Sequence, residues 1–459
     1  TLMAWYFLSA GLILGGQWAY EELGWGGFWA WDPVENAALM PWLTGTAFLH
    51  SVMIQEKRNM LKIWNVVLII TTFGLTIIGT FLTRSGIINS VHSFTQSEIG
   101  PAFLVYLALV LIVGFAFLFK RIQMLESEYK IDSVLCRENI FLAQNILLVG
   151  IAFTVLLGTT FPLLAEAVRG TKLSIQAPFF NTITAPMGYA LLILMGIGML
   201  ISWRRSSLDN LRRNFKNPLI VASLGTIFLI WLLYEKSLQF GVYIIFWSTI
   251  FVTSTILFEI VKATQIQNRQ TESNILMGLF YAISRNRRRY GGLMIHFGVV
   301  LMFLGFAGTF FSLEKDLTLE IGESKEIGNY RLEFQSVSEF MSGNARHRAA
   351  IINVYDSENN FLETLKPAKS FYPTQPQPLT EVAIRRTFLE DLYLIFSSEN
   401  AEEESSITIK VHINPLVSWA WAALPIFTIG IGICLTYRPK SLITQEIVNR
   451  ERYLATRES

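Results

Sequence analysis

Ten apolar stretches, each long enough to cross a bilayer, dominate this chain of 459 residues. They lie near residues 2–19, 37–55, 61–83, 101–119, 139–164, 183–203, 217–234, 239–261, 293–312 and 415–436. Because a helix crosses the hydrocarbon core with about 20 apolar residues, they predict an all-α polytopic membrane protein with about ten transmembrane helices. Charged residues make up only 16% of the chain, against about 25% in soluble domains. This composition argues against a soluble enzyme, a secreted disulfide scaffold and a protein that binds nucleic acid.

Lysines and arginines predict the orientation of these helices. More than half of the 37 lie in the segments 55–62, 120–138, 204–216, 262–292 and 437–459. The short loops on the opposite side carry only Arg84, Arg169, Lys172 and Lys236. The positive-inside rule therefore makes the first set of segments cytoplasmic.

One long hydrophilic segment, residues 313–414, then lies outside the cytoplasm. Apolar residues alternate along it, as at Leu317, Leu319 and Ile321, which is typical of half-buried strands. We predict three parts: a transmembrane domain over 1–312, a small β-rich domain over 313–414, and a final helix with a cytoplasmic tail over 415–459.

The two cysteines, Cys136 and Cys434, are far apart and form neither a CxxC nor a CxxCH motif. A disulfide framework, a zinc site and covalent attachment of heme to this chain therefore lack their minimal sequence signature.

Two histidines are predicted to lie at similar depth in the membrane. His50 follows Ala37 by 13 residues, which places it about 20 Å along its helix, toward the cytoplasmic end. His296 lies just after the cytoplasmic start of another helix. Neutral imidazoles at matched depth suit bis-axial ligation of a heme iron, although each could instead simply form a hydrogen bond with a neighbouring helix.

The other three histidines are predicted to lie outside the membrane. His92 and Arg84 share a short outer loop, where Arg84 could pair with a heme propionate or with a lipid phosphate. His347 stands between two arginines, and His412 shares the side of its strand with Lys410. We interpret these last two as ordinary surface residues on polar faces.

A tryptophan-rich segment lies on the outer side between the first two helices. Trp25, Trp29 and Trp31 alternate with glycines and end at Asp32-Pro33. Tryptophans often form an interfacial belt, but glycines also allow close backbone approach and indoles offer flat stacking faces. The segment therefore suits a planar amphipathic ligand. Asp32 and Glu35 are expected to cap the next helix, with proton transfer as the alternative role.

The residues from Trp25 to Asn36 resemble the WWD signature of the heme-handling membrane proteins of cytochrome c biogenesis. Within that superfamily the chain resembles the CcmF type, the membrane subunit of the cytochrome c heme lyase. Further matches, which extend the resemblance over essentially the whole chain, are Leu49–Ser51, Leu82–His92, Gly291–Val300, Pro378–Tyr393 and Asn414–Val417.

The resemblance implies two heme sites. His50 and His296 match the axial ligands of an intramembrane heme b. His92 matches one of two outer histidines that ligate the iron of a transient substrate heme, and the pocket around this heme comprises the WWD segment at about 21–36, with Trp25, Trp29, Trp31 and Asp32, together with Arg84. No histidine precedes Trp25, where the family has its second outer histidine. We therefore expect a chain that is N-terminally truncated or one part of a split protein.

The resemblance also implies a function in cytochrome c maturation. Heme from a CcmE-type chaperone would be joined by thioether bonds to apocytochrome c, which CcmH-type and CcmI-type subunits present. The intramembrane heme b would supply electrons, with quinol as a candidate donor, and no residue is assigned a catalytic role. The location would be the bacterial inner membrane with residues 313–414 in the periplasm, or alternatively the mitochondrial inner membrane.

Two other functions predict different sequence features. A heme exporter or carrier without ligation activity would have the WWD segment but no intramembrane histidine pair. A secondary transporter would have interrupted helices and a charged site at mid-membrane. The spans carry few interior charges, which argues against the transporter.

Overall fold

The computed structural model describes residues 1–85, 99–127, 133–170, 173–233, 239–272, 274–374, 377–399 and 406–436. The helices are α1 (Leu2–Glu22), α2 (Pro33–Arg58), α3 (Lys62–Arg84), α4 (Gly100–Lys120), η1 (Ile122–Leu125), α5 (Arg137–Arg169), α6 (Ala177–Leu200), α7 (Leu208–Leu232), α8 (Phe240–Thr271), α9 (Ile275–Arg285), α10 (Arg287–Gly308), η2 (Thr309–Phe311) and α11 (Val417–Leu435). A helix thus forms over each of the ten apolar stretches.

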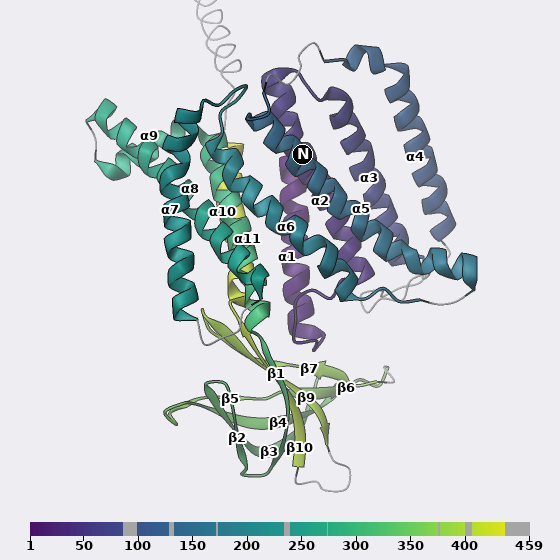
Figure 1. Cartoon of the computed structure of the whole chain (residues 1–459). Helices are drawn as coiled ribbons and strands as arrows, with labels where there is room; N and C mark the ends of the chain where they lie inside the picture. Colours follow the sequence, from purple (N-terminus) through teal and green to yellow (C-terminus); the bar gives the residue numbers. More distant parts are fainter. Residues whose placement is uncertain are drawn as a thin grey trace, which may run out of the picture.

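Nine of the described helices are long and apolar enough to cross a membrane. They are α2 to α8, α10 together with η2, and α11. Helix α1 is not among the nine, although it has 21 residues, because glycines, tryptophans, a glutamine and two terminal glutamates lower its hydropathy. It packs against α2 and α11 within the bundle (Figure 1).

Helix α9 is an element that the sequence did not predict, because its 11 residues are too few to span a bilayer. It lies in the segment expected to be a cytoplasmic loop. Ile275, Leu276 and Phe280 are exposed on it, and Arg285 ends it.

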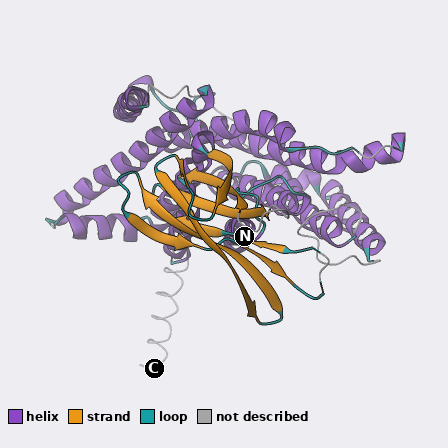
Figure 2. Cartoon of the chain, turned by 90° about the horizontal axis from the view of Figure 1, so that it is seen from below, coloured by secondary structure: helices purple, strands orange, loops and turns teal. Residues whose placement is uncertain are grey.

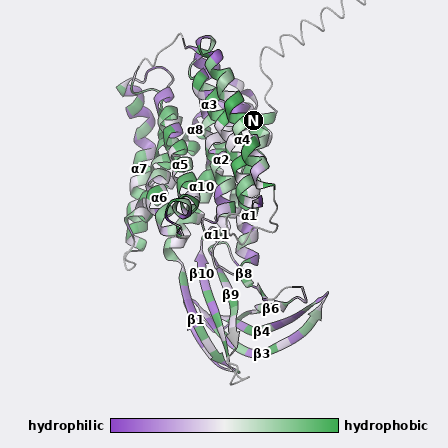
Figure 3. Cartoon of the chain, turned by 90° about the vertical axis from the view of Figure 1, so that its right-hand side faces the viewer, coloured by the Kyte–Doolittle hydropathy of each residue, from purple (hydrophilic) through white to green (hydrophobic). Residues whose placement is uncertain are grey.

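The helices form one bundle in which the first and last elements of the chain meet. Helix α10 packs along α11, and α2 packs against α3 and α5. Helix α4 lies at the edge of the bundle beside α3, and much of its apolar surface is exposed. Figure 3 shows apolar residues along the helices and a more mixed pattern on the strands.

Two antiparallel sheets lie beneath one end of the bundle (Figures 1 and 2). Their strands are β1 (Leu313–Glu320), β2 (Ser324–Ile327), β3 (Tyr330–Ser342), β4 (Ala345–Asp356), β5 (Phe361–Leu365), β6 (Ala368–Phe371), β7 (Leu379–Glu381), β8 (Ala383–Arg386), β9 (Glu390–Glu399) and β10 (Ser406–Pro415). The four-stranded sheet has the order β1-β10-β9-β8, and the six-stranded sheet has the order β2-β3-β4-β6-β7 with β5 on β4.

The two sheets share one apolar core. It contains Leu317, Leu319, Ile327, Tyr330, Leu332, Phe334, Ala350, Ile352, Val354, Leu365, Leu392, Leu394, Phe396, Ile407, Ile409, Val411 and Ile413. Residues of both sheets face inward with the period of two that strands impose. We refer to β1–β10 as the sandwich, and it is inserted between α10 and α11 as the alternation in the sequence indicated.

Candidate functional site

His50 on α2 and His296 on α10 lie together inside the bundle. Their ring centroids are 6.0 Å apart, and the ring planes are inclined by 52°. Nδ1 of His50 lies 2.9 Å from the carbonyl oxygen of Thr46, and Nδ1 of His296 lies 2.7 Å from that of Gly292. An Nδ1–H that donates to a backbone carbonyl leaves the lone pair on Nε2, the form of imidazole that binds a metal.

The spacing of this pair fits a metal already held by a macrocycle. Two metal–imidazole bonds of about 2 Å, together with the ring radii, separate the centroids of two axial imidazoles by about 6 Å. Within the described ranges, no group of three or more His, Cys, Asp or Glu residues could hold a bare ion. Both imidazoles are half-buried, and a Cβ added to Gly292 would meet no heavy atom within 4 Å, so open space adjoins His296.

A row of aromatic rings leads from this pair to two cations. Phe141 meets His50 edge-on at 5.4 Å, and Trp203 meets Phe141 at 5.8 Å. Lys57 Nζ lies 4.8 Å and Arg137 Cζ lies 5.5 Å from the Trp203 ring centroid. Arg137 also donates to the carbonyl oxygens of residues 199 and 201. Positive charge therefore gathers at the end of this row, beyond Trp203 from the histidine pair.

The start of α2 is capped as the sequence predicted. Oδ2 of Asp32 accepts from the amide of Val34 at 2.9 Å, and Oε2 of Glu35 accepts from the amides of Ala30 and Asp32 at 3.0 Å each. Asp32 and Glu35 also form a capping box, in which each side chain accepts from the backbone amide of the other residue and satisfies an amide that otherwise has no partner at a helix start. Asp32 and Glu35 thus have a clear structural role in closing the tryptophan-rich segment.

Trp31 of this segment contacts α6, a helix that the sequence did not link to it. Trp31 stacks on Phe180 with centroids 4.9 Å apart and planes inclined by 10°, and its Nε1 donates to Oδ1 of Asn181 at 2.8 Å. Trp29 meets Trp31 edge-on at 5.9 Å. Trp25, Trp29 and Trp31 are all half-buried, so part of each indole remains accessible. Phe180 and Asn181 follow a proline in an otherwise ordinary apolar helix, and no pattern there singles them out.

The histidine pair and the tryptophan-rich segment form two separate sites, which lie far apart along α2. His50 follows Asp32 by 18 residues along α2, which corresponds to about 27 Å of helix. Arg84 ends α3 on the same side as the segment, because α3 runs back along α2 and Gly79 lies against Ala37. His92 lies outside the described residues.

The structure corrects our interpretation of His412. The side of β10 that it shares with Lys410 is partly exposed, but His412 itself is only 6% exposed. It meets Tyr393 edge-on at 5.8 Å and lies against the backbone of Gly26. The tryptophan-rich segment covers the strand at this point, which the pattern within the strand could not reveal. His347 is bonded to Ser370 on the sandwich, with Nδ1 2.7 Å from the hydroxyl.

The apolar helices and the inserted sandwich define a multi-pass membrane protein with a β-sandwich between its last two helices. Residues 1–88 match the family model described as cytochrome C assembly protein, and residues 310–415 match the model described as CcmF C-terminal beta-sandwich. The start of the chain is thus similar to proteins of cytochrome c assembly, and its inserted sandwich is similar to that of CcmF.

Relatives and a solved structure agree with this similarity. The chain is 34% identical over 440 residues to the cytochrome c-type biogenesis protein ccl1 of Rhodobacter capsulatus, which covers 95% of this chain and 65% of that protein. It is 33% identical over 445 residues to CcmF of Escherichia coli, which covers 95% of this chain and 64% of that protein. The solved structure of the cytochrome c heme lyase CcmF has a TM-score of 0.75 at 32% identity and covers 95% of this chain and 65% of that one. The chain therefore spans slightly less than two thirds of these proteins.

Proposed function

We propose that this chain acts in cytochrome c maturation, in which heme received at the outer membrane face is joined covalently to apocytochrome c. The observation that carries the proposal is the pairing of His50 and His296, with ring centroids 6.0 Å apart inside the bundle. The similarity to CcmF proteins supports the same process.

His50 and His296 are the residues that would hold an intramembrane heme b. Their backbone hydrogen bonds orient both rings before any ligand binds. When bound, heme b supplies one-electron redox chemistry, which suits the reducing conditions that thioether formation requires. Lys57 and Arg137, which lie near Trp203, would supply positive charge for the carboxylates of such a heme.

The tryptophan-rich segment would bind the substrate heme. The accessible faces of Trp25, Trp29 and Trp31 suit stacking on a porphyrin, and the capping box of Asp32 holds the end of the segment in place. We propose His92 as a ligand of the substrate iron and Arg84 as a partner of a propionate. Each cysteine thiol of apocytochrome c then adds across a vinyl group, with the sulfur and the hydrogen going to its two carbons. The chain acts mainly through positioning.

The partners proposed on this basis are a CcmE-type heme chaperone, CcmH-type and CcmI-type subunits, apocytochrome c and a quinol as electron donor. The described bundle makes the chain a membrane protein. We propose the bacterial inner membrane as its location, with the sandwich on the periplasmic side, opposite the lysine-rich and arginine-rich loops.

The test is the heme content of purified variants together with maturation of a c-type cytochrome in cells. His50→Ala and His296→Ala should each remove most of the low-spin heme b spectrum, because a six-coordinate iron loses one of its two protein ligands. His347→Ala is the matched control, since His347 lies on the sandwich, and it should keep the spectrum of the unaltered protein. Full heme b content in both ligand variants would refute the assignment.

A second arm of the same experiment separates ligation from transport. His92→Ala should impair cytochrome c maturation severalfold or more and leave the heme b spectrum unchanged. Accumulation of heme on the outer face with no effect of the chain on thioether formation would favour the exporter or carrier instead.

A further inference from the structure

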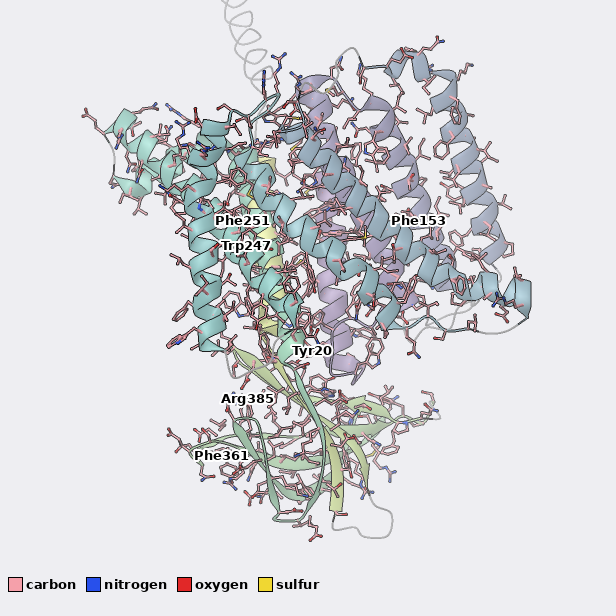
Figure 4. All side chains as sticks on the ribbon, viewed as in Figure 1. Tyr20, Phe153, Trp247, Phe251, Phe361 and Arg385 are labelled. Carbon is pink, nitrogen blue, oxygen red and sulfur yellow. The ribbon has the colours of Figure 1, made fainter. Side chains whose placement is uncertain are left out.

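The sandwich contacts the tryptophan-rich segment through a buried polar junction. Tyr20, near the end of α1, lies where the bundle meets the sandwich (Figure 4) and is fully buried. Its hydroxyl donates to Oδ2 of Asp391 on β9 at 3.3 Å. Asn414 on β10 donates from Nδ2 to the Tyr20 hydroxyl at 3.1 Å and to the carbonyl oxygen of Gly26 at 2.8 Å. One side chain of the sandwich thus joins α1 to the segment.

The backbone of the segment leaves no room for side chains at this contact. Gly24 and Gly26 have φ values of 63° and 75°, in the left-handed region that favours glycine. A Cβ added to Gly26 would lie 2.5 Å from Nε2 of His412, and one added to Gly24 would lie 3.0 Å from Cγ2 of Thr380. Both glycines therefore permit the segment to lie directly on the sandwich.

The opposite end of the segment is held by the membrane helices. Trp31 is stacked on Phe180 and bonded to Asn181 of α6, and Asn36 donates to the carbonyl oxygen of Trp31 at 3.0 Å. Trp25 lies within the sandwich contact, between Gly24 and Gly26, and Trp29 lies between that contact and Trp31, each with part of its surface accessible. The position of their indoles thus depends on the sandwich as well as on the bundle.

We infer that the sandwich positions the tryptophan-rich segment for ligand binding, with Asn414 and His412 as the positioning residues. They set the backbone at Gly26, and through it the indole faces of Trp25 and Trp29. The ligand would be a planar porphyrin, and this part of the inference rests on the proposed function. The sandwich is then a structural part of the outer site, in addition to any surface it offers to partners.

The test is hydrogen–deuterium exchange of the full chain, purified with its membrane heme. Asn414→Ala should raise exchange of the amides at 24–31 by about tenfold, because the bonds to Gly26 and Tyr20 are both lost. The matched control is Thr408→Ala. Thr408 lies on β10, the strand of Asn414, and its side chain contacts Thr318 of β1 at an exposed position. Its loss should leave exchange of the amides at 24–31 unchanged. Unaltered exchange at 24–31 in Asn414→Ala would overturn the inference.

A second pair of variants keeps the test decisive if Asn414→Ala unfolds the sandwich. Gly26→Ala and His412→Ala should each speed exchange at 24–31, because the first forces a methyl group against the His412 ring and the second removes the ring on which the segment lies. Exchange at 24–31 that is unaltered in both variants would overturn the inference.

Titration with hemin then tests whether the segment binds a porphyrin. Asn414→Ala should weaken binding of added hemin about tenfold while the membrane heme spectrum stays unchanged. Binding as tight as in the unaltered protein would overturn the positioning role. If the unaltered protein binds no added hemin, the proposed outer site is wrong, and the exchange data still decide whether the sandwich holds the segment.

Discussion

At the scale of single residues, the buried carboxyl of Asp391 destabilises the folded protein when it is ionised. Asp391 is fully buried, and burial raises the pKa of its carboxyl to about 6, against the opposing effects of Arg386 and of the hydrogen bonds from Tyr20, the backbone of Thr387 and Ser418. The protonated form is therefore the one that folding favours. Protonated Asp391 therefore contributes to the stability of the folded protein. This contribution is complete below about pH 4 and is lost as the pH rises through 6.

Asp391→Asn should remove this pH dependence. The amide carries no charge and can still accept from the Tyr20 hydroxyl, so we expect the variant to be more stable than the unaltered protein at pH 7.5 by about 1–3 kcal/mol. At pH 4.5 the difference should shrink. Thermal unfolding of the purified protein at both pH values measures it, with Asp316→Asn on the exposed edge of β1 as control. A difference that does not vary with pH would contradict the prediction.

At the scale of elements, the helix that carries His296 depends on a row of glycines. Gly291, Gly298 and Gly305 recur every seven residues along α10 and face α11. A Cβ at these positions would meet Gly430, Phe427 and Ala420 of α11 at 2.5–2.8 Å. Small residues permit such close helix packing in membranes, and this packing sets where His296 stands relative to α2.

Gly305→Ala should separate α10 from α11, because the new methyl group would meet the backbone nitrogen of Ala420 at 2.9 Å. We expect a loss of about 1–3 kcal/mol in stability and a lower heme b content. Gly432→Ala is the matched control on α11, since a Cβ there meets no atom within 4 Å. The measurements are the melting temperature and the heme absorbance of the two variants. Equal values in both would show that the contact between α10 and α11 tolerates the added methyl group.

At the scale of the whole molecule, the sandwich is an insertion with its own core. Its first and last strands pair, with Leu313 opposite Ile413, so the chain leaves α10 and returns to α11 at neighbouring points. Among the residues that the structure describes, the apolar core of the sandwich consists of residues from the sandwich itself. A smaller cluster around Tyr20, Tyr393, Ile395 and Val417 joins it to the bundle.

Replacement of residues 313–414 by a short Gly-Ser linker should therefore leave the intramembrane site intact. We expect the heme b spectrum to persist and binding of added hemin to fall, because the segment loses Asn414 and His412. The control carries the same linker in the turn at Gly343, between β3 and β4, and should keep both properties. Loss of the heme b spectrum only in the replacement variant would show that the bundle needs the sandwich to fold.

Sequence patterns predicted the elements well because each has a period or a length imposed by its surroundings. Apolar runs located the helices, alternation located the strands of the sandwich, and Asp32 with Glu35 indicated the start of α2. Helix α9 was missed because it is too short to span a bilayer. The expected surface position of His412 was wrong because another segment covers its strand.

The order of residues by itself determined the ten apolar helices, the inserted sandwich and the similar depths of His50 and His296. Depth follows from counting residues along a helix of constant rise. Distance between helices does not follow from such counting, because it depends on packing between parts of the chain far apart in sequence. Packing alone therefore brought the two imidazoles to 6.0 Å, placed Trp31 on Phe180 and laid Gly26 against His412.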